Sequence, residues 1–148
     1  MNYYNSTAVL PGRTLLTAVW RAASYLANRI EQRLEPTGLS LPKLQMLTHL
    51  VEAGEPLPLG KLAGRSACAK SNVTQLVDRL EADGLVRREP DPDDRRSVRA
   101  VITDAGLCAY ETAARAQAEA EAELLESLSP DEQQHLASLL ERFREARA

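Results

Sequence analysis

Residues 70–102 read KSNVTQLVDRLEADGLVRREPDPDDRRSVRAVI, and the hydrophobic period changes part-way along this stretch. In its first half, apolar residues recur at the three- and four-residue steps of an amphipathic helix. These residues are Val73, Leu76, Val77 and Leu80. Gly84 is suited to end that helix. Beyond it, apolar and polar residues alternate around a turn rich in proline and aspartate. The stretch therefore predicts a helix over 70–83 and then a two-stranded hairpin over 85–102.

The residues before this stretch complete a recognisable arrangement. Pro58 is expected to open a short helix, and a break follows at 66–69. A short helix, a tight break, a second helix and a hairpin form a winged helix-turn-helix. We assign the helix-turn-helix to 58–84 and the wing to 85–102, within a lobe that spans 40–102.

Long helices are predicted on both sides of this lobe. One covers 13–35, where apolar residues keep a helical period until Pro36 and Gly38, and the residues before it are expected to form a loose arm. A second begins after Thr103 and runs to about 127. A last helix starts at the capping box formed by residues 129–132, so that helical chain covers most of 104–146. The expected fold is a single domain over 1–148, mainly α with a small β-hairpin.

The composition fits one soluble domain that needs no disulfide bond or structural metal ion. Of the 148 residues, 44% are hydrophobic, 26% are charged and only 4% are aromatic, which favours helices packed by aliphatic side chains. No apolar run is long enough to span a bilayer, and the first residues lack the pattern of a secretory signal. We expect a cytoplasmic protein that has no membrane partner. Cys68 and Cys108 lack metal-ligand spacing and are expected to be buried and inert.

Charge is distributed unevenly along the chain. The net charge is −3, which by itself argues weakly against a nucleic-acid partner. Residues 61–99, however, hold nine lysines and arginines against seven aspartates and glutamates, whereas residues 100–148 hold four against ten. A protein that places one region on phosphates and keeps another away from them would show this distribution.

The predicted second helix of the helix-turn-helix has a polar face suited to double-stranded DNA. Asparagine and glutamine can bond adenine edges, serine and threonine are adaptable, and lysine and arginine suit guanine or phosphate. The residues expected to contact DNA from this helix are Lys70, Ser71, Asn72, Thr74, Gln75 and Arg79. The wing adds arginines, whose side chains are long enough to enter a minor groove. They are Arg87, Arg88, Arg95, Arg96 and Arg99.

Two other functional classes compete with this interpretation. An enzyme is disfavoured because the sequence offers no nucleophile–base pair, glycine-rich phosphate loop or metal-ligand cluster, and His49 and His135 are far apart. We therefore predict no catalytic residue, metal or cofactor. A winged helix that only docks proteins is the stronger alternative. A winged helix that only docks proteins would not need the polar helix face or the wing arginines, but this chain has both.

Two motifs in series resemble the MarR family of bacterial and archaeal regulators. NVTQLVDRLEADGLVRR at 72–88 is similar to that family's recognition helix and first wing strand. DRRSVRAVITDAG at 94–106 resembles its wing signature, with Ile102 in place of the usual leucine. The outer helices also lie where the family has them, so that the resemblance covers nearly the whole chain.

The resemblance implies a homodimer built from the first helix and the last two. Members bind pseudo-palindromic operators, usually as repressors near their own gene. By resemblance, Asp94 would pair with and orient Arg96, which would enter the minor groove, and Arg95 would reach the backbone or groove beside it. Many members release DNA when they bind a small phenolic or anionic effector, so that such a ligand is a possible partner.

The resemblance also suggests where an effector could bind, between the dimer helices and the DNA-binding lobe. The residues assigned to this site by position are Trp20, Arg21, Met46, His49, Thr74 and Arg88. The chain departs from the family at two places. Ala69 stands where a serine or threonine cap is common, and the first helix lacks the cysteine that oxidation-sensing members carry there.

Overall fold

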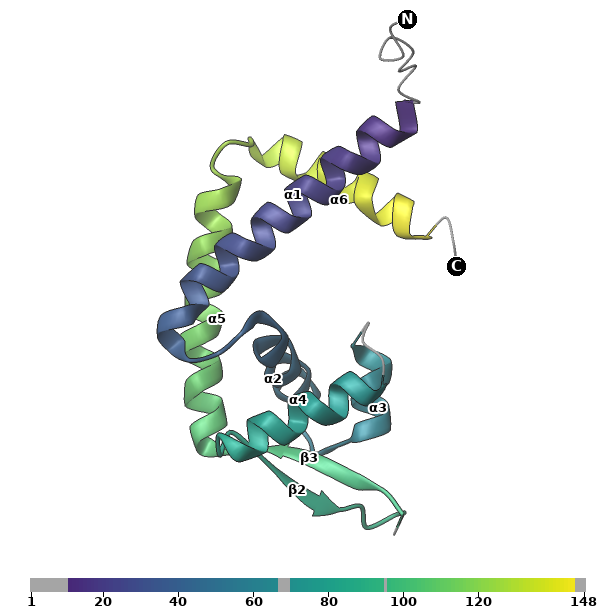
Figure 1. Cartoon of the computed structure of the whole chain (residues 1–148), viewed down its shortest axis with the longest axis vertical. Helices are drawn as coiled ribbons and strands as arrows, with labels where there is room; N and C mark the ends of the chain where they lie inside the picture. The colour runs from purple at the N-terminus through teal and green to yellow at the C-terminus, as the bar shows by residue number, and fades with distance from the viewer. Residues whose placement is uncertain (1–10, 67–69, 95, 146–148) are drawn as a thin grey trace, which may run out of the picture.

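The computed structural model describes residues 11–66, 70–94 and 96–145, and its fold is mainly α with a small antiparallel sheet, as the sequence predicts (Figure 1). In chain order the elements are α1 (Pro11–Leu34), the short 3-10 helix η1 (Glu35–Thr37), α2 (Leu41–Ala53), β1 (Leu57–Pro58), α3 (Leu59–Arg65), α4 (Lys70–Ala82), β2 (Val86–Pro90), β3 (Val98–Ile102), α5 (Asp104–Leu125) and α6 (Pro130–Glu145).

The sheet has three strands, so the prediction of a two-stranded hairpin was incomplete. Strand order is β1-β3-β2, with β3 antiparallel to both neighbours. In β1, Leu57 pairs with Ala100 and Pro58 with Arg99. Because β1 has only two residues, it shows no alternation that a sequence pattern could reveal. Pro58 therefore ends a strand and precedes α3, and does not itself open that helix.

Several helix ends follow from local chemistry. The hydroxyl oxygen of Thr103 accepts a hydrogen bond from the N–H of Gly106, which caps α5 as predicted. At the start of α6, Ser129 and Glu132 exchange the hydrogen bonds of a capping box. One boundary was wrong: α1 begins at Pro11, inside the segment expected to be a loose arm. Proline is well suited to the first position of a helix, where its missing N–H costs nothing.

The buried core lies in the winged lobe and under α5. Its largest members are aliphatic side chains from the helices and from β2. They are Leu34, Leu44, Met46, Leu47, Leu62, Val73, Val77, Leu80 and Val86. Residue 106 must be glycine for α5 to close on this lobe, because a Cβ there would overlap the carbonyl oxygen of Leu85 and the side chain of Ile102.

The outer helices leave large apolar side chains uncovered in the single chain. Figure 1 shows α1, the upper part of α5 and α6 extending away from the lobe. Trp20 on α1 is 74% exposed and Phe143 on α6 is 64% exposed. Other exposed apolar residues on these two helices are Leu15, Leu16, Val19, Leu26, Leu136, Leu139 and Leu140. No helix among the described residues is both long and apolar enough to cross a membrane.

The prediction that both cysteines are buried was wrong for Cys108, which is exposed on α5. The face of α5 that meets the core carries Gly106, Ala113 and Ala120. Cys108 lies about 200° around the helix from Gly106 and so points away from the core. Cys68 lies outside the described residues.

Candidate nucleic-acid interface

The side chains of α4 fall into three rows along the helix. The buried row packs on the core and consists of Val73, Val77 and Leu80, none of which is exposed. A second row faces solvent and carries Asn72, Gln75 and Arg79. Successive members of each row are three or four positions apart, which keeps them on one face of a helix. The sequence thus separates core-packing from polar side chains, as the DNA-binding prediction requires.

The third row of α4 is turned toward the wing. It consists of Thr74, Asp78 and Glu81, and the elements α4 and β2 are in contact. The carboxylates of Asp78 and Glu81 accept hydrogen bonds from the guanidinium of Arg88 on β2, and so does the backbone carbonyl of Thr74. Thr74 was predicted to contact DNA; its side chain is exposed, but it stands in this row and not in the row of Asn72 and Gln75.

Three predicted DNA contacts cannot be placed. The side chains of Lys70 and Ser71, and the whole of Arg95, lie outside the described residues. The assumed cap residue Ala69 also lies outside them. Lys70 nevertheless begins α4, at the residue from which the sequence predicts this helix.

The wing is a hairpin that projects beyond the helices of the lobe (Figure 1). Its strands pair from Val86 with Ile102 to Pro90 with Val98. The turn is closed by its own backbone, since the N–H of Asp91 donates to the carbonyl of Ser97 at 3.1 Å. This bond continues the pairing of the two strands into the turn.

Asp94 acts on Arg96 through the main chain. Its Oδ1 accepts a hydrogen bond from the backbone N–H of Arg96 at 2.9 Å. The expected ion pair between the side chains of Asp94 and Arg96 is not among the ion pairs of the described residues. An aspartate two residues before an N–H readily forms such an Asx turn, which leaves the guanidinium of Arg96 free to point outward.

The wing arginines on the strands are already engaged. Arg87 Nη1 lies 3.0 Å from Glu89 Oε2, and Arg99 Nη2 lies 2.5 Å from Glu89 Oε1. Arg88 pairs with Asp78 at 2.6 Å and with Glu81 at 2.5 Å. Burial works against the charge of Arg88, but the hydrogen bonds and charges of the two carboxylates outweigh it and raise its pKa. Among the described wing arginines, Arg96 alone has no ion-pair partner.

The residues assigned to an effector site are spread over α1, α2, α4 and β2, and none of them lines a pocket among the described side chains. Trp20 and Arg21 are exposed on α1, whereas Met46 is 1% exposed and belongs to the core. His49 is half-buried, and its carbonyl accepts a long hydrogen bond from Arg65. Thr74 and Arg88 do meet, at 3.5 Å, but two carboxylates already occupy the Arg88 donors. This geometry disfavours an anion at Arg88.

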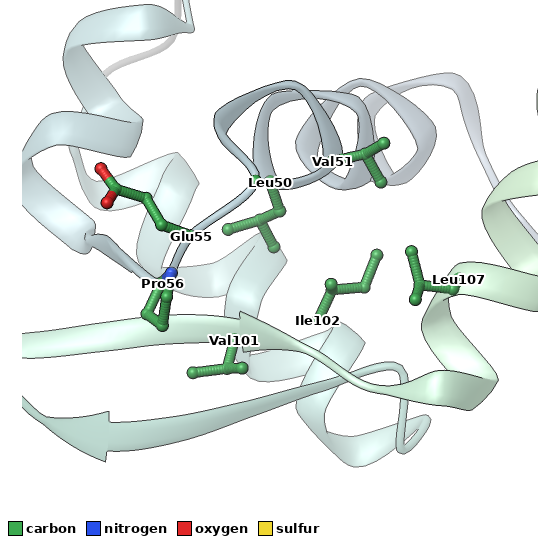
Figure 2. A pocket seen from close by; sticks show the side chains of 8 residues that line it. Leu50, Val51, Glu55, Pro56, Val101, Ile102 and Leu107 are labelled. Carbon is green, nitrogen blue, oxygen red and sulfur yellow. The ribbon is translucent and has the colours of Figure 1, made fainter.

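An apolar pocket of ≈ 270 Å³ lies elsewhere, between the end of α2, β3 and the first turn of α5 (Figure 2). It is lined by Leu50, Val51, Gly54, Glu55, Pro56, Val101, Ile102 and Leu107. Figure 2 shows the carboxylate of Glu55 pointing away from the apolar side chains. None of the predicted effector residues lines this pocket, because sequence position does not show how a loop, a strand and two helices meet.

Known proteins match this arrangement along most of the chain. The model of the MarR family matches residues 39–98, which include the helix-turn-helix and most of the wing. An uncharacterized HTH-type transcriptional regulator, YkoM of Bacillus subtilis, is 38% identical over 139 residues, which cover 94% of this chain and 90% of YkoM. This chain belongs to the MarR family.

Solved structures agree with that assignment. Sco3205, a MarR family regulator from Streptomyces coelicolor solved in complex with DNA, is 25% identical with a TM-score of 0.82 over 93% of this chain and 92% of that chain. The organohalide-sensing regulator RdhR-CbdbA1625, solved with 2,4-dichlorophenol bound, shares the fold at 19% identity, with a TM-score of 0.89 over 99% and 89% of the two chains.

The family assignment decides between the alternatives that the sequence left open. As a MarR-family member, the chain is a DNA-binding transcriptional regulator with a winged helix, and a docking module is not favoured. Sequence analysis missed the roles of Asp78 and Glu81 in this interface. The signal that could have found them is their spacing, since positions 74, 78 and 81 share one helix face.

Proposed function

We propose that this MarR-family regulator acts as a cytoplasmic homodimeric repressor on a pseudo-palindromic operator. In this mode α4 lies in the major groove and the tip of the wing enters the minor groove. The observation that carries the proposal is the solvent-facing row Asn72, Gln75 and Arg79, next to a hairpin whose Arg96 has no partner among the described ion pairs.

The row on α4 has the chemistry needed to read bases. The amides of Asn72 and Gln75 can each donate to and accept from an adenine edge, and Arg79 can bind guanine or phosphate. Lys70 and Ser71 at the start of the same helix would add phosphate contacts. Arg96 would supply the positive charge that a narrow minor groove attracts.

The uncovered apolar faces support the homodimer. Exposed leucines on α1 and α6, together with Trp20 and Phe143, form a surface that a monomer would leave in water. A second copy could cover this surface with its own α1 and α6. Two winged lobes would then face successive major grooves, about 34 Å apart along the DNA.

The operator test uses the purified full chain and the DNA upstream of its own gene. Fluorescence anisotropy should show tight binding that falls with salt, with log K changing by about −0.9 per log salt for each phosphate neutralised. A scrambled sequence of equal length is the control. Equal affinity for both DNAs, or an affinity that does not change with salt, would contradict specific operator binding.

The dimer test changes one face of α6. Phe143→Asp should give a monomer in sedimentation velocity at micromolar concentration, because a carboxylate would be forced into the apolar contact. Gln134→Asp adds the same charge to the other side of α6 and should stay dimeric. If the unmodified chain itself sediments as a 16.3 kDa species, no dimer exists to disrupt.

We also propose that a small, weakly polar aromatic effector weakens DNA binding by filling the pocket in Figure 2. Two observations support this. A structural neighbour is a regulator solved with 2,4-dichlorophenol, and the pocket lining is almost entirely apolar. Val101 and Ile102 of the lining belong to β3, which is also a wing strand. A ligand between α2 and β3 could therefore shift the wing.

Titrating 2,4-dichlorophenol and salicylate into the protein–operator complex tests this site. The phenol should release DNA at lower concentration than the anionic salicylate, and Leu107→Asn should reduce the release. Leu125→Asn is the matched control, since Leu107 and Leu125 are 38% and 37% exposed on the same helix. Equal loss of response in both variants would count against the pocket.

A further inference from the structure

The open edge of β2 is fastened to α4 by side chains. Among the described residues β2 pairs only with β3, so its other edge has no described strand to bond with. Glu81 Oε1 accepts the backbone N–H of Arg88 at 3.0 Å, and Glu81 Oε2 accepts Arg88 Nη1 at 2.5 Å. One carboxylate thus satisfies a main-chain donor of the edge strand and also holds its side chain.

Arg88 reaches two further acceptors on α4. Its Nη2 lies 2.6 Å from Asp78 Oδ1 and 3.5 Å from the carbonyl oxygen of Thr74. The acceptors span two turns of the helix, from 74 to 81. A planar guanidinium with donors on both sides is therefore held at several points, which restricts rotation between the strand and the helix.

We infer that Arg88, with Asp78 and Glu81, is a latch that sets the direction of the wing relative to the recognition helix. In this role Arg88 is a positioning residue that does not contact DNA. The inference rests on the proposed entry of the wing into the minor groove. It deepens that proposal by naming the residues that aim the wing.

A small rotation of the hairpin at Arg88 would displace the tip of the wing. From Arg88 to the turn the strand runs about four residues, or about 13 Å. A tilt of about 10° at Arg88 would move the tip by about 2 Å at that lever arm. A hydrogen bond from Arg96 to a base or sugar would be lost over that distance.

The charges around Arg88 also suit a positioning role. Asp78 and Glu81 lie on the helix that faces phosphates, where uncompensated carboxylates repel DNA. Arg88 is outnumbered by these two partners, so little of its charge is available to a phosphate. By electrostatics alone, Asp78→Asn should tighten DNA binding, whereas the latch predicts weaker operator binding.

The test measures operator affinity and its salt dependence for Arg88→Lys and Asp78→Asn. Lysine keeps the charge but has a single donor nitrogen, so it cannot reproduce the planar arrangement in which Nη1 binds Glu81 while Nη2 binds Asp78. Both variants should bind operator about tenfold more weakly, as expected when one charged hydrogen bond no longer restrains the wing. The salt slope should stay at the wild-type value, because no phosphate contact is removed. Circular dichroism and sedimentation should show an unchanged fold and assembly.

Arg87→Lys is the matched control. Arg87 is on the same strand, but it pairs with Glu89 of that strand and so cannot tie the wing to α4. Its operator affinity should stay closer to wild type than that of Arg88→Lys, because lysine keeps the charge at position 87 and every contact between the wing and α4 is left in place.

The latch is overturned if Arg88→Lys binds operator like wild type, if Asp78→Asn binds more tightly, or if Arg88→Ala lowers the salt slope by about 0.9 for each site. Arg96→Ala in the same series separates the two proposals. Wild-type binding by Arg96→Ala would show that the wing does not enter the groove. A defect in Arg88→Lys would then have to arise through α4 alone, which contradicts the latch as well. Weak binding by Arg96→Ala with normal Arg88→Lys and Asp78→Asn overturns only the latch.

Discussion

Arg96 and Arg88 stand on the same hairpin but differ in what surrounds them. Arg88 is held by two carboxylates, whereas the guanidinium of Arg96 has no ion-pair partner among the described residues. The main-chain N–H of Arg96 is fixed by Asp94. A free guanidinium on a fixed backbone is suited to bind a ligand, while a paired one is suited to hold structure.

Arg96→Ala should therefore weaken operator binding by about 1.5–3 kcal/mol per site, the size of a hydrogen bond to a charged group. Asp94→Ala should have a smaller effect of about 0.5–1.5 kcal/mol, because it releases only the backbone that directs Arg96. Neither change should alter the free energy of unfolding by more than about 0.5 kcal/mol. Anisotropy and urea unfolding measure the two quantities. Loss of stability equal to the loss of affinity would contradict this division of roles.

Gln75→Ala should act on specificity. The exposed amide of Gln75 can bond a base edge in two ways, and losing it should cut discrimination at one base pair by about 1–3 kcal/mol. Binding to scrambled DNA should change little, because phosphate contacts supply most non-specific affinity. Competition assays with single-base operator variants check this. An equal loss on all DNAs would show that Gln75 contacts the backbone.

At the scale of elements, the joint between the wing and α5 depends on one glycine. Gly106→Ala should destabilise the fold by about 1–3 kcal/mol, because the added methyl group would overlap Leu85 and Ile102. Gly60→Ala is the control: Gly60 is also helical, and a methyl group added there would meet nothing within 4 Å. That change should be neutral or stabilise by up to about 1 kcal/mol. Thermal melts that rank the two variants in the opposite order would contradict the close approach.

The capping box of α6 should give this helix a pH dependence. Hydrogen bonds from the backbone and hydroxyl of Ser129 lower the pKa of Glu132 below its ordinary value of 4.5. A lowered folded-state pKa means that the stabilisation is present above the unfolded value and is lost as pH falls through the folded one. Glu132→Gln should therefore show a smaller drop in melting temperature than the unmodified chain between pH 7 and pH 3. Identical drops would show that the box does not contribute.

Most elements could be predicted from the sequence because each has a strong local signal. The helical period of α4, the alternation in β3, and the Thr103 and Ser129 caps all depend on residues close together in the chain. β1 could not be predicted, because two residues carry no period. The apolar pocket and the Arg88 pairs were also missed, because both depend on contacts between elements that local patterns do not encode.

At the scale of the whole molecule, charge and apolar surface divide the protein into two working regions. The winged lobe presents polar and basic side chains, whereas α1 and α6 present uncovered apolar side chains. Residues 100–148 hold four lysines and arginines against ten aspartates and glutamates, and Figure 1 shows that the upper part of α5 and α6 extend away from the winged lobe. This division suits a dimer that binds DNA at one end and joins its partner at the other.

A hydroxyl-radical footprint of the dimer on its operator tests this account most directly. We predict two protected regions related by a two-fold axis, with their centres about one helical turn apart. Minor-groove protection should flank each region and should disappear in Arg96→Ala while the central protection remains. A single asymmetric footprint, or flanking protection that persists in Arg96→Ala, would contradict a dimer that reads the major groove with α4 and the minor groove with its wing.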